Sequence, residues 1–270
     1  MPVTLVKAHA LGNDFLLVAL DDLPPDVDRV GFARVACERH RGVGGDGLIV
    51  YEATVDGVRM ALLNADGSYS EVSGNGVRCL AAWLAVWNAM EPGETVDVLT
   101  DAGVKRLELL DVVGGQYVFR AHMGQPEQIA QTRLEVHGSA VNAVTLRVGN
   151  PQCVVLGEVS EERLRAVASA LAVHPHFPEG TNVELAIVEA PDRVRILIWE
   201  RGVGPTEASG TGACAAAVAA MEFGGAARDV TVVSPGGTQR VEWTDGGLFL
   251  TGWAEVTALC EWRPEIPRRA

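Results

Sequence analysis

The chain repeats itself at about half its length, and this repeat limits its folds more than any other feature of the sequence. The stretches EVSGNGVRC (71–79) and EASGTGACA (207–215) are near-copies, with Ser73 and Ser209 lying 136 positions apart in a chain of 270 residues. Three further blocks match in the same order at nearly the same offset. They are GNDF (12–15) with GNPQ (149–152), LLNADGSYS (62–70) with IWERGVGPT (198–206), and VDVLTDAGVKRLE (96–108) with VTVVSPGGTQRVE (230–242). Matched blocks in one order predict two related halves with one architecture.

Each half is expected to contain many short strands and few helices. Apolar spacing and alanine content predict helices at 30–40, 75–88, 161–171 and 211–222. Alternating or β-rich runs predict strands at 3–6, 15–19, 47–51, 59–63, 96–100, 107–110, 117–120, 144–148, 153–156, 193–199, 230–233, 240–243 and 248–250. The fold class is therefore α+β and largely antiparallel.

The duplication predicts two pseudo-symmetric domains, each a sheet or barrel wrapped around a central helix, with a ligand cleft between them. The first half is expected to span 1–121 and the second 122–261, with the tail from about 262 to 270 packing back onto the first half.

Composition excludes several classes of function. The net charge of −13 and the absence of a run of Lys or Arg argue against a nucleic-acid partner. The longest apolar runs are too short to span a bilayer and no leader is recognised, so we expect no membrane association and a cytoplasmic location. The five cysteines are odd in number and lack CxxC spacing, which indicates buried thiols rather than disulfides or a zinc site.

Ser73 and Ser209 each stand where a helix is expected to begin. The simplest interpretation is a helix N-cap, because serine is among the best capping residues. The three small residues that follow would also leave backbone N–H groups uncovered, which suits an anion. Two such turns on one carboxylate would place a side chain on each face of the α-carbon, the geometry that stereoinversion requires.

These turns and the residues around them resemble those of the diaminopimelate epimerases. The resemblance runs through nearly the whole chain, in KAHALGNDF (7–15), ERHRGVGGDGL (38–48), NADGSYSEVSGNGVRC (64–79), GNPQCV (149–154), HPHFPEGTNVE (174–184), ERGVGPTEASGTGACA (200–215) and SPGG (234–237). It implies an isomerase that interconverts LL- and meso-diaminopimelate by two-base proton transfer at Cα, in lysine and peptidoglycan biosynthesis. It also implies no pyridoxal phosphate or other cofactor, no metal, a small-molecule substrate and a possible homodimer.

The resemblance also implies roles for individual residues. Those that would bind the distal amino-acid end of the substrate are Asn13, Asn64, Asn150, Asn182 and Arg201, and Glu200 would take an amino group and join the catalytic set. Those that would hold the reacting carboxylate through backbone amides are Gly74, Asn75, Gly210 and Thr211. Asn side chains and a bidentate Arg suit a zwitterionic head group.

The sequence departs from the family where the chemistry is expected. The two acid/base groups of the family are cysteines, and here Ser73 and Ser209 occupy both positions; Gln152 stands where the family usually has His. An alkanol ionises several pH units above a thiol, so little or no turnover is expected. Three interpretations stay open: an epimerase whose thiols were replaced, a natural Ser/Ser relative that isomerises another amino acid, and a non-catalytic amino-acid-binding protein.

Overall fold

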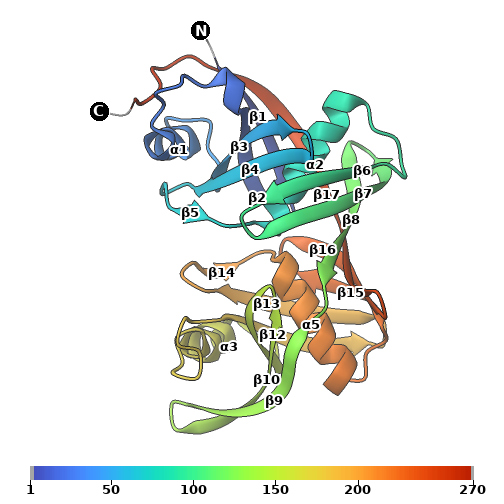
Figure 1. Ribbon diagram of the computed structural model, residues 1–270. Coiled ribbons are helices and arrows are strands. Elements are labelled where there is room, and N and C mark those ends of the chain that lie inside the picture. Colours follow the sequence, from blue (N-terminus) through green and yellow to red (C-terminus); the bar gives the residue numbers. More distant parts are fainter. Residues whose placement is uncertain (1–2, 269–270) are drawn as a thin grey trace. The chain divides into compact units, whose positions relative to one another are not determined.

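Residues 3–268 are described by a computed structural model (Figure 1). Their contacts divide the chain into two compact units, one formed by the residues up to Ala121 together with those from Gly252 onward, and the other by His122–Thr251. The sequence-based assignment of residues 252–261 to the second half was wrong. Strand β17 (Gly247–Trp262) runs from unit 2 into unit 1, where its later part pairs with strand β1 (Val3–Ala10) from Val3↔Trp262 to His9↔Glu255.

Pro267 and Arg268, which follow β17, also contact unit 1; the last two residues of the predicted tail, 269–270, lie outside the described residues. The backbone N–H of Asp28 donates to the carbonyl of Pro267 at 2.8 Å, and Arg268 forms an ion pair with Asp26 at 3.1 Å.

Unit 1 contains the following elements besides β1. They are β2 (Asn13–Ala19), the 3₁₀ turn η1 (Leu20–Asp22), α1 (Arg29–Cys37), β3 (Gly47–Thr54), β4 (Gly57–Asn64), β5 (Tyr69–Ser70), α2 (Gly74–Asn88), β6 (Thr95–Thr100), β7 (Gly103–Val113) and β8 (Gln116–Gly124), which ends in unit 2.

Unit 2 repeats this order. Its elements are β9 (Glu127–Val136), β10 (Ser139–Val148), β11 (Asn150–Leu156), a helical stretch formed by α3 (Glu161–Arg163), the π-helical turn η2 (Leu164–Ala168) and α4 (Ser169–Ala172), then β12 (Asn182–Ala190), β13 (Arg193–Glu200), β14 (Gly204–Thr206), α5 (Gly210–Phe223), β15 (Asp229–Ser234), β16 (Gly237–Thr244) and the start of β17.

Strand pairing shows the duplication directly. In unit 1, β1 and β2 form an antiparallel hairpin, β2 and β3 are parallel, β3 and β4 antiparallel, and β4 and β6 parallel. In unit 2, β10–β11, β11–β12, β12–β13 and β13–β15 repeat the same four relationships in the same order. The sheets are therefore mixed, although antiparallel pairs outnumber parallel ones, and the predicted α+β class is confirmed.

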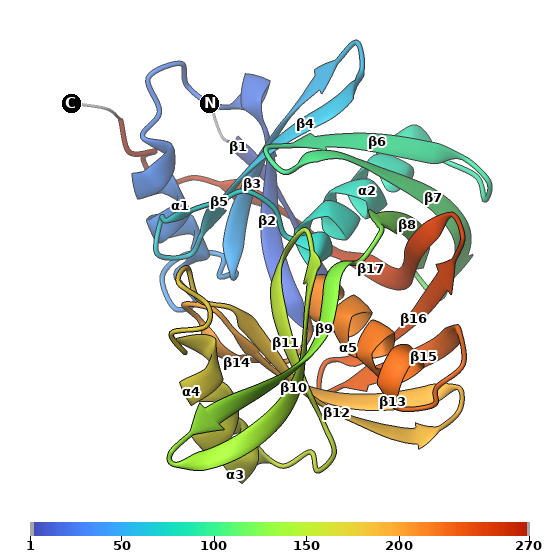
Figure 2. The same cartoon turned by 60° about the horizontal axis from the view of Figure 1, so that its bottom comes forward.

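Each unit encloses one central helix. Helix α5 contacts β10, β11, β12, β13, β15 and β16, and α2 contacts β1, β2, β6 and β7 (Figures 1 and 2). Both helices are buried on every side from their first turn to the turn before their end. Helices that meet strands all round need short side chains, and α5 accordingly reads GTGACAAAVAAMEF.

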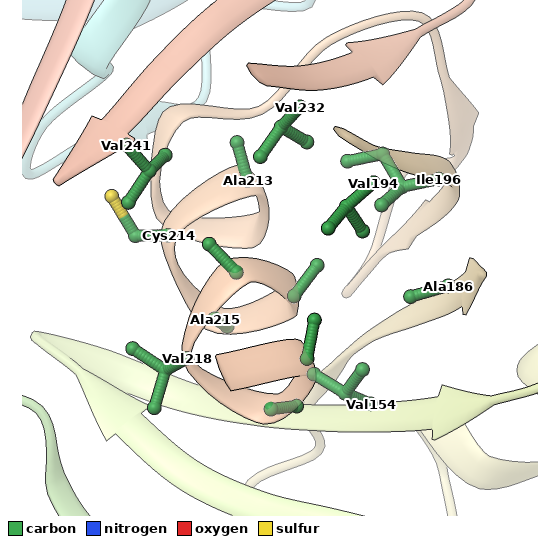
Figure 3. Close-up of a cluster of buried hydrophobic side chains, with 14 of the residues drawn as sticks. Val154, Ala186, Val194, Ile196, Ala213, Cys214, Ala215, Val218, Val232 and Val241 are labelled. Carbon is green, nitrogen blue, oxygen red and sulfur yellow. The ribbon is translucent and has the colours of Figure 1, made fainter. Parts of the chain in front are cut away.

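The core around α5 is made of β-branched residues from the strands packed on alanines from the helix. In Figure 3, Val154, Ile196 and Val232 come from three different strands and lie around Ala213 and Val218 of the helix. Short helix side chains let these larger strand residues pack close to the backbone of α5.

Four strands were not expected from the sequence, the short β5 and β14 and the longer β9 and β12. Strand β9 is largely polar and half-exposed, and β12 reads as an apolar run interrupted by an acid, so neither carries a clear alternating pattern. Within residues 3–268, no helix is both long and apolar enough to cross a membrane.

The enclosure of α2 predicts a large cost for shortening a side chain in its middle. Leu80 is fully buried, and we expect Leu80→Ala to lower the free energy of unfolding by about 2–5 kcal/mol, measured by urea denaturation. Val86 lies on the same helix but is 42% exposed, so the control Val86→Ala should change it by less than about 1 kcal/mol. Equal effects of the two changes would contradict the enclosed position of α2.

Candidate active site

The two predicted serines cap the two central helices in the same way. Ser73 Oγ accepts a hydrogen bond from the N–H of Gly76 at 3.1 Å, and Ser209 Oγ accepts one from the N–H of Gly212 at 3.2 Å. Both serines have extended backbone, with φ of −127° and −140°. A helix leaves its first N–H groups outside its own hydrogen-bond ladder. The backbone amides of Gly74, Asn75, Gly210 and Thr211 therefore stand at two equivalent helix starts, and a helix start of this kind suits an anion.

Strand register aligns three of the remaining candidates, Asn64, Asn182 and Glu200. In unit 1, Phe15 pairs with Gly47 and Gly47 with Asn64, so the three lie in one row. In unit 2, Gln152 pairs with Asn182, and the register of β12 and β13 brings Asn182 opposite Glu200. Two residues further along these strands, all the side chains except Glu184 belong to the cores around α2 and α5. Because side chains alternate, both rows face the central helices near their first turns.

In unit 1 the amide groups of Asn13 and Asn75 are joined. Asn75 is 4% exposed, and its Nδ2 donates to Asn13 Oδ1 at 3.2 Å. Its Oδ1 accepts a hydrogen bond from the guanidinium of Arg78, a buried residue that the sequence did not suggest. Asn64 is exposed and donates through Nδ2 to Ser68 Oγ at 2.9 Å.

The Nδ2 group of Asn13 contacts an ion-pair network. Asp46 Oδ2 accepts from Asn13 Nδ2 at 2.7 Å, and Arg39 bridges Asp46 and Asp14 through Nη2, at 2.8 Å to each. Lys7 Nζ lies 2.9 Å from Asp14 Oδ2. Burial of Asp14 opposes its ionisation, but hydrogen bonds and charge from Arg39 and Lys7 outweigh burial and hold its pKa well below the usual range.

In unit 2 the candidates form two hydrogen-bonded pairs. Gln152 Nε2 donates to Asn150 Oδ1 at 2.6 Å, and Asn182 Oδ1 accepts from the backbone N–H of Arg201 at 2.9 Å. The guanidinium of Arg201 is exposed and donates to the carbonyl of Glu179 at 2.9 Å.

Glu200 lies next to the second serine. Burial raises the pKa of the Glu200 carboxyl, and a side-chain hydrogen bond with Ser209 lowers it in part. Ser73 has Asn64 in the row position that Glu200 occupies beside Ser209. The two halves are therefore chemically different, since this row position holds a carboxyl group beside Ser209 and an amide beside Ser73.

A second acid lies deeper in unit 2 and was not predicted. Glu184 is 0% exposed on β12, and burial together with the neighbouring charge of Glu200 raises its pKa well above the usual value. A signal for it exists in the sequence, because a single acid interrupts the apolar run NVELAIV (182–188). Buried acids are rare unless they are paired or serve a purpose.

The five cysteines of the chain lie away from positions 73 and 209, and four of them are buried. Cys37, Cys79, Cys153 and Cys214 are buried, whereas Cys260 is half-buried, so the expectation of burial was wrong for that residue. Burial raises the pKa of Cys37 and of Cys153 to about 12 and also raises that of Cys79, which leaves these groups protonated near neutral pH. Across residues 3–268, no three His, Cys, Asp or Glu side chains gather in a way that could hold a metal ion.

Solved structures share this two-unit fold. A hydroxyproline epimerase from Agrobacterium vitis with bound trans-4-hydroxy-L-proline superposes with a TM-score of 0.68 at 14% identity, covering 96% of this chain and 90% of that one. A PhzF-family phenazine biosynthesis protein from Bacillus anthracis gives a TM-score of 0.71 at 14% identity over 98% of this chain and 100% of that one. At such identities these likenesses show the fold class alone.

Sequence comparison is more specific. The model of the diaminopimelate epimerase family matches residues 5–129 and 144–257. The diaminopimelate epimerase of Heliobacterium modesticaldum is 38% identical over 283 residues, covering 97% of this chain and 99% of the relative. The chain is thus an isomerase of the amino-acid epimerase and racemase class. It belongs to the diaminopimelate epimerase family.

The capping geometry predicts a structural role for both serines. Removing the hydroxyl in Ser73→Ala or Ser209→Ala leaves the N–H of Gly76 or Gly212 without its acceptor, and should lower the free energy of unfolding by about 0.5–2 kcal/mol. Ser139 is exposed at the start of β10, so the control Ser139→Ala should stay within about 0.5 kcal/mol. Urea denaturation measures all three, and an unchanged midpoint for the first two would exclude capping.

The network around Asp14 predicts a pH-dependent contribution to stability. Because the folded-state pKa of Asp14 is depressed, its contribution is complete above about pH 5 and is lost as the pH falls further. We expect Asp14→Asn to cost about 1–3 kcal/mol at pH 7 and progressively less below pH 4. The control Asp97→Asn removes an ion pair with Arg106 on the surface of the same unit and should cost less than about 1 kcal/mol. A cost for Asp14→Asn that does not shrink in acid would contradict the ion-pair explanation.

Proposed function

We propose that this chain has the architecture of a cofactor-independent epimerase for LL- and meso-diaminopimelate, and that its Ser/Ser form has little or no turnover. The observation that carries the proposal is the pair of equivalent helix starts, each capped by the residue at the family's thiol position. The proposal requires both turns to address one α-carbon. It places the chain in lysine and peptidoglycan biosynthesis, with a small amino acid as its substrate and a homodimer as a possible assembly.

The proposed chemistry needs an anion cradle and two proton-transfer groups. Backbone amides of Gly74, Asn75, Gly210 and Thr211 would bind the reacting carboxylate. As the α-proton leaves, negative charge spreads onto that carboxylate, and fixed amides stabilise it without reorganising. The groups at positions 73 and 209 would then take a proton from one face and give one to the other.

Recognition of the second amino-acid group would use amides and one guanidinium. Asn13, Asn64, Asn150 and Asn182 offer both donors and acceptors, and Arg201 offers a planar pair of donors for a carboxylate. Glu200 would take an ammonium group. Asn13 and Asn150 are each held by a hydrogen bond to another side chain, which fixes their amides before a ligand arrives.

The serines are the obstacle to turnover. An alkanol ionises well above a thiol, whose ordinary pKa is about 8.5, so Ser73 cannot act as a standing base near pH 7. Glu200 contacts Ser209, but a carboxyl group is far too weak a base to ionise an alcohol even with a raised pKa. The environment at each position suits a thiolate, since a helix N-terminus lowers a thiol pKa.

The decisive experiment is exchange of the α-proton of LL-diaminopimelate in D2O, followed by NMR. We expect no exchange with the chain as it stands, and exchange with formation of the meso isomer by the Ser73→Cys/Ser209→Cys variant. Each single Cys variant is the matched control and should fall far short of the double variant, because inversion needs one group on each face.

Other outcomes would replace the proposal. Exchange by the unmodified chain would contradict the expected loss of turnover. Absence of exchange in the double variant, with diaminopimelate still stabilising the protein in a thermal-shift titration, would favour a binding protein. Absence of both effects would indicate a different amino acid as the ligand.

A further inference from the structure

The two halves differ most in the second row of side chains beneath the helix starts. In unit 1 this row contains Leu17, Ile49 and Leu62, all apolar. In unit 2 the equivalent row contains Val154, Glu184 and Ile198. Ile49 and Glu184 occupy the same place, since a methyl group added at Gly76 would lie 3.1 Å from Ile49 Cδ1, and one added at Gly212 would lie 2.7 Å from Glu184 Oε1. At this position an acid therefore packs under α5, whereas an isoleucine packs under α2.

The first row, nearer the helix starts, also has a polar side chain in unit 2 where unit 1 has an apolar one. Phe15 in unit 1 is replaced by Gln152 in unit 2, and both lie on the strand next to Ile49 and Glu184 respectively. Gln152 and Glu184 are each 0% exposed. Three of their atoms, Gln152 Oε1 and both carboxyl oxygens of Glu184, have no hydrogen-bond partner among the described residues. Buried polar atoms are normally paired, and unpaired ones cost about 1–3 kcal/mol each.

The surroundings of Glu184 determine which form of the acid fits. The titratable groups that act on it are Glu200 on β13 and Cys153 on β11, and the first turn of α5 contributes no ionisable side chain. No cation among the described residues balances its charge, and Glu200 would repel a second carboxylate. A neutral acid avoids both costs and gains an O–H donor, which an ionised carboxylate lacks.

We propose that Glu184 is a positioning residue that stays a neutral carboxylic acid and donates its O–H to Gln152 Oε1. Gln152 then donates through Nε2 to Asn150 Oδ1, the 2.6 Å contact present in the structure. The chain of two hydrogen bonds orients the Asn150 amide so that its N–H groups point away from Gln152. The effect of these two hydrogen bonds on ligand binding rests on the proposed function, in which Asn150 binds the substrate.

The first test concerns the proton and needs no ligand. A neutral acid in the folded state makes the protein less stable as the pH rises above the ordinary carboxyl value near 4.3, with the unfolding equilibrium constant rising up to tenfold per pH unit. Glu184→Gln removes this pH dependence. The free energy of unfolding of the variant, relative to that of the unmodified chain, should therefore increase from pH 5 to pH 8 in urea denaturation. Cys153, with a pKa of about 12, does not titrate in this range.

Infrared spectroscopy gives an independent signature. The unmodified chain at neutral pH should show a carboxylic-acid C=O band that disappears in Glu184→Gln. Glu189→Gln is the matched control on the same strand, because Arg193 and Arg195 hold the Glu189 carboxylate ionised and its removal should leave the band. Persistence of the band in Glu184→Gln, or an unchanged pH dependence of stability, would overturn the assignment of a neutral Glu184.

The second test concerns positioning. Glu184→Gln still offers an N–H donor to Gln152 and should bind diaminopimelate within about twofold of the unmodified chain by calorimetry. Glu184→Met has similar volume without a donor and should bind about tenfold more weakly, the order of effect of one lost buried hydrogen bond. Ile49→Met, at the apolar counterpart in unit 1, controls for repacking and should leave affinity unchanged.

The results of the two tests separate this proposal from the proposed function. Failure of the unmodified chain to bind diaminopimelate would reject the proposed function, while the pH and infrared results would still decide the state of Glu184. Equal affinity of Glu184→Met and the unmodified chain would reject the positioning role.

Discussion

Close contact between a helix and the strands around it is the constraint on which each unit depends. Helix α5 meets strands on several sides and α2 does the same, so neither has a solvent face along most of its length. Strands can approach a helix so closely only where its side chains are short, which accounts for the alanines of α5. The buried surface also offsets the weak intrinsic stability of a helix that begins with two glycines.

The same contact determines where polar chemistry can occur. Along the middle of α5 the facing strand residues are Val154, Ala186 and Ile196, which leave no room for water. At the strand ends beside the first helical turn the facing residues become Asn, Gln and Glu, and here alone the helix presents unpaired N–H groups. The candidate site is thus the place where an apolar enclosure gives way to polar strand ends. In unit 2 the polar residues extend one row further into the enclosure than in unit 1, because Glu184 lies in the second row.

The elements whose signal is local could be predicted from the sequence. The starts of α2 and α5 followed from Ser73 and Ser209, because capping is a property of a few consecutive residues and the repeat supplied it twice. Residues whose importance depends on tertiary contacts were missed. Asp46 and Glu184 are distant in sequence from the groups they act on, and only strand register and burial bring them together. Arg78 lies one helical turn from Asn75, but its burial depends on the strands around α2. The end of the second half was misplaced for the same reason, since the composition of β17 does not reveal its pairing with β1.

The path of β17 has a consequence for how the protein is made. The strand β1 precedes unit 2 in the sequence, yet one of its two neighbours, β17, is completed only after unit 2 has been synthesised. Until then β1 presents an open edge, a template for pairing with other chains. Unit 2 is contiguous from His122 to Thr251 and needs no residue from the end of the chain. During synthesis the middle of the protein can therefore be complete while its beginning still waits, and the N-terminal unit carries the greater risk of misassembly on the ribosome.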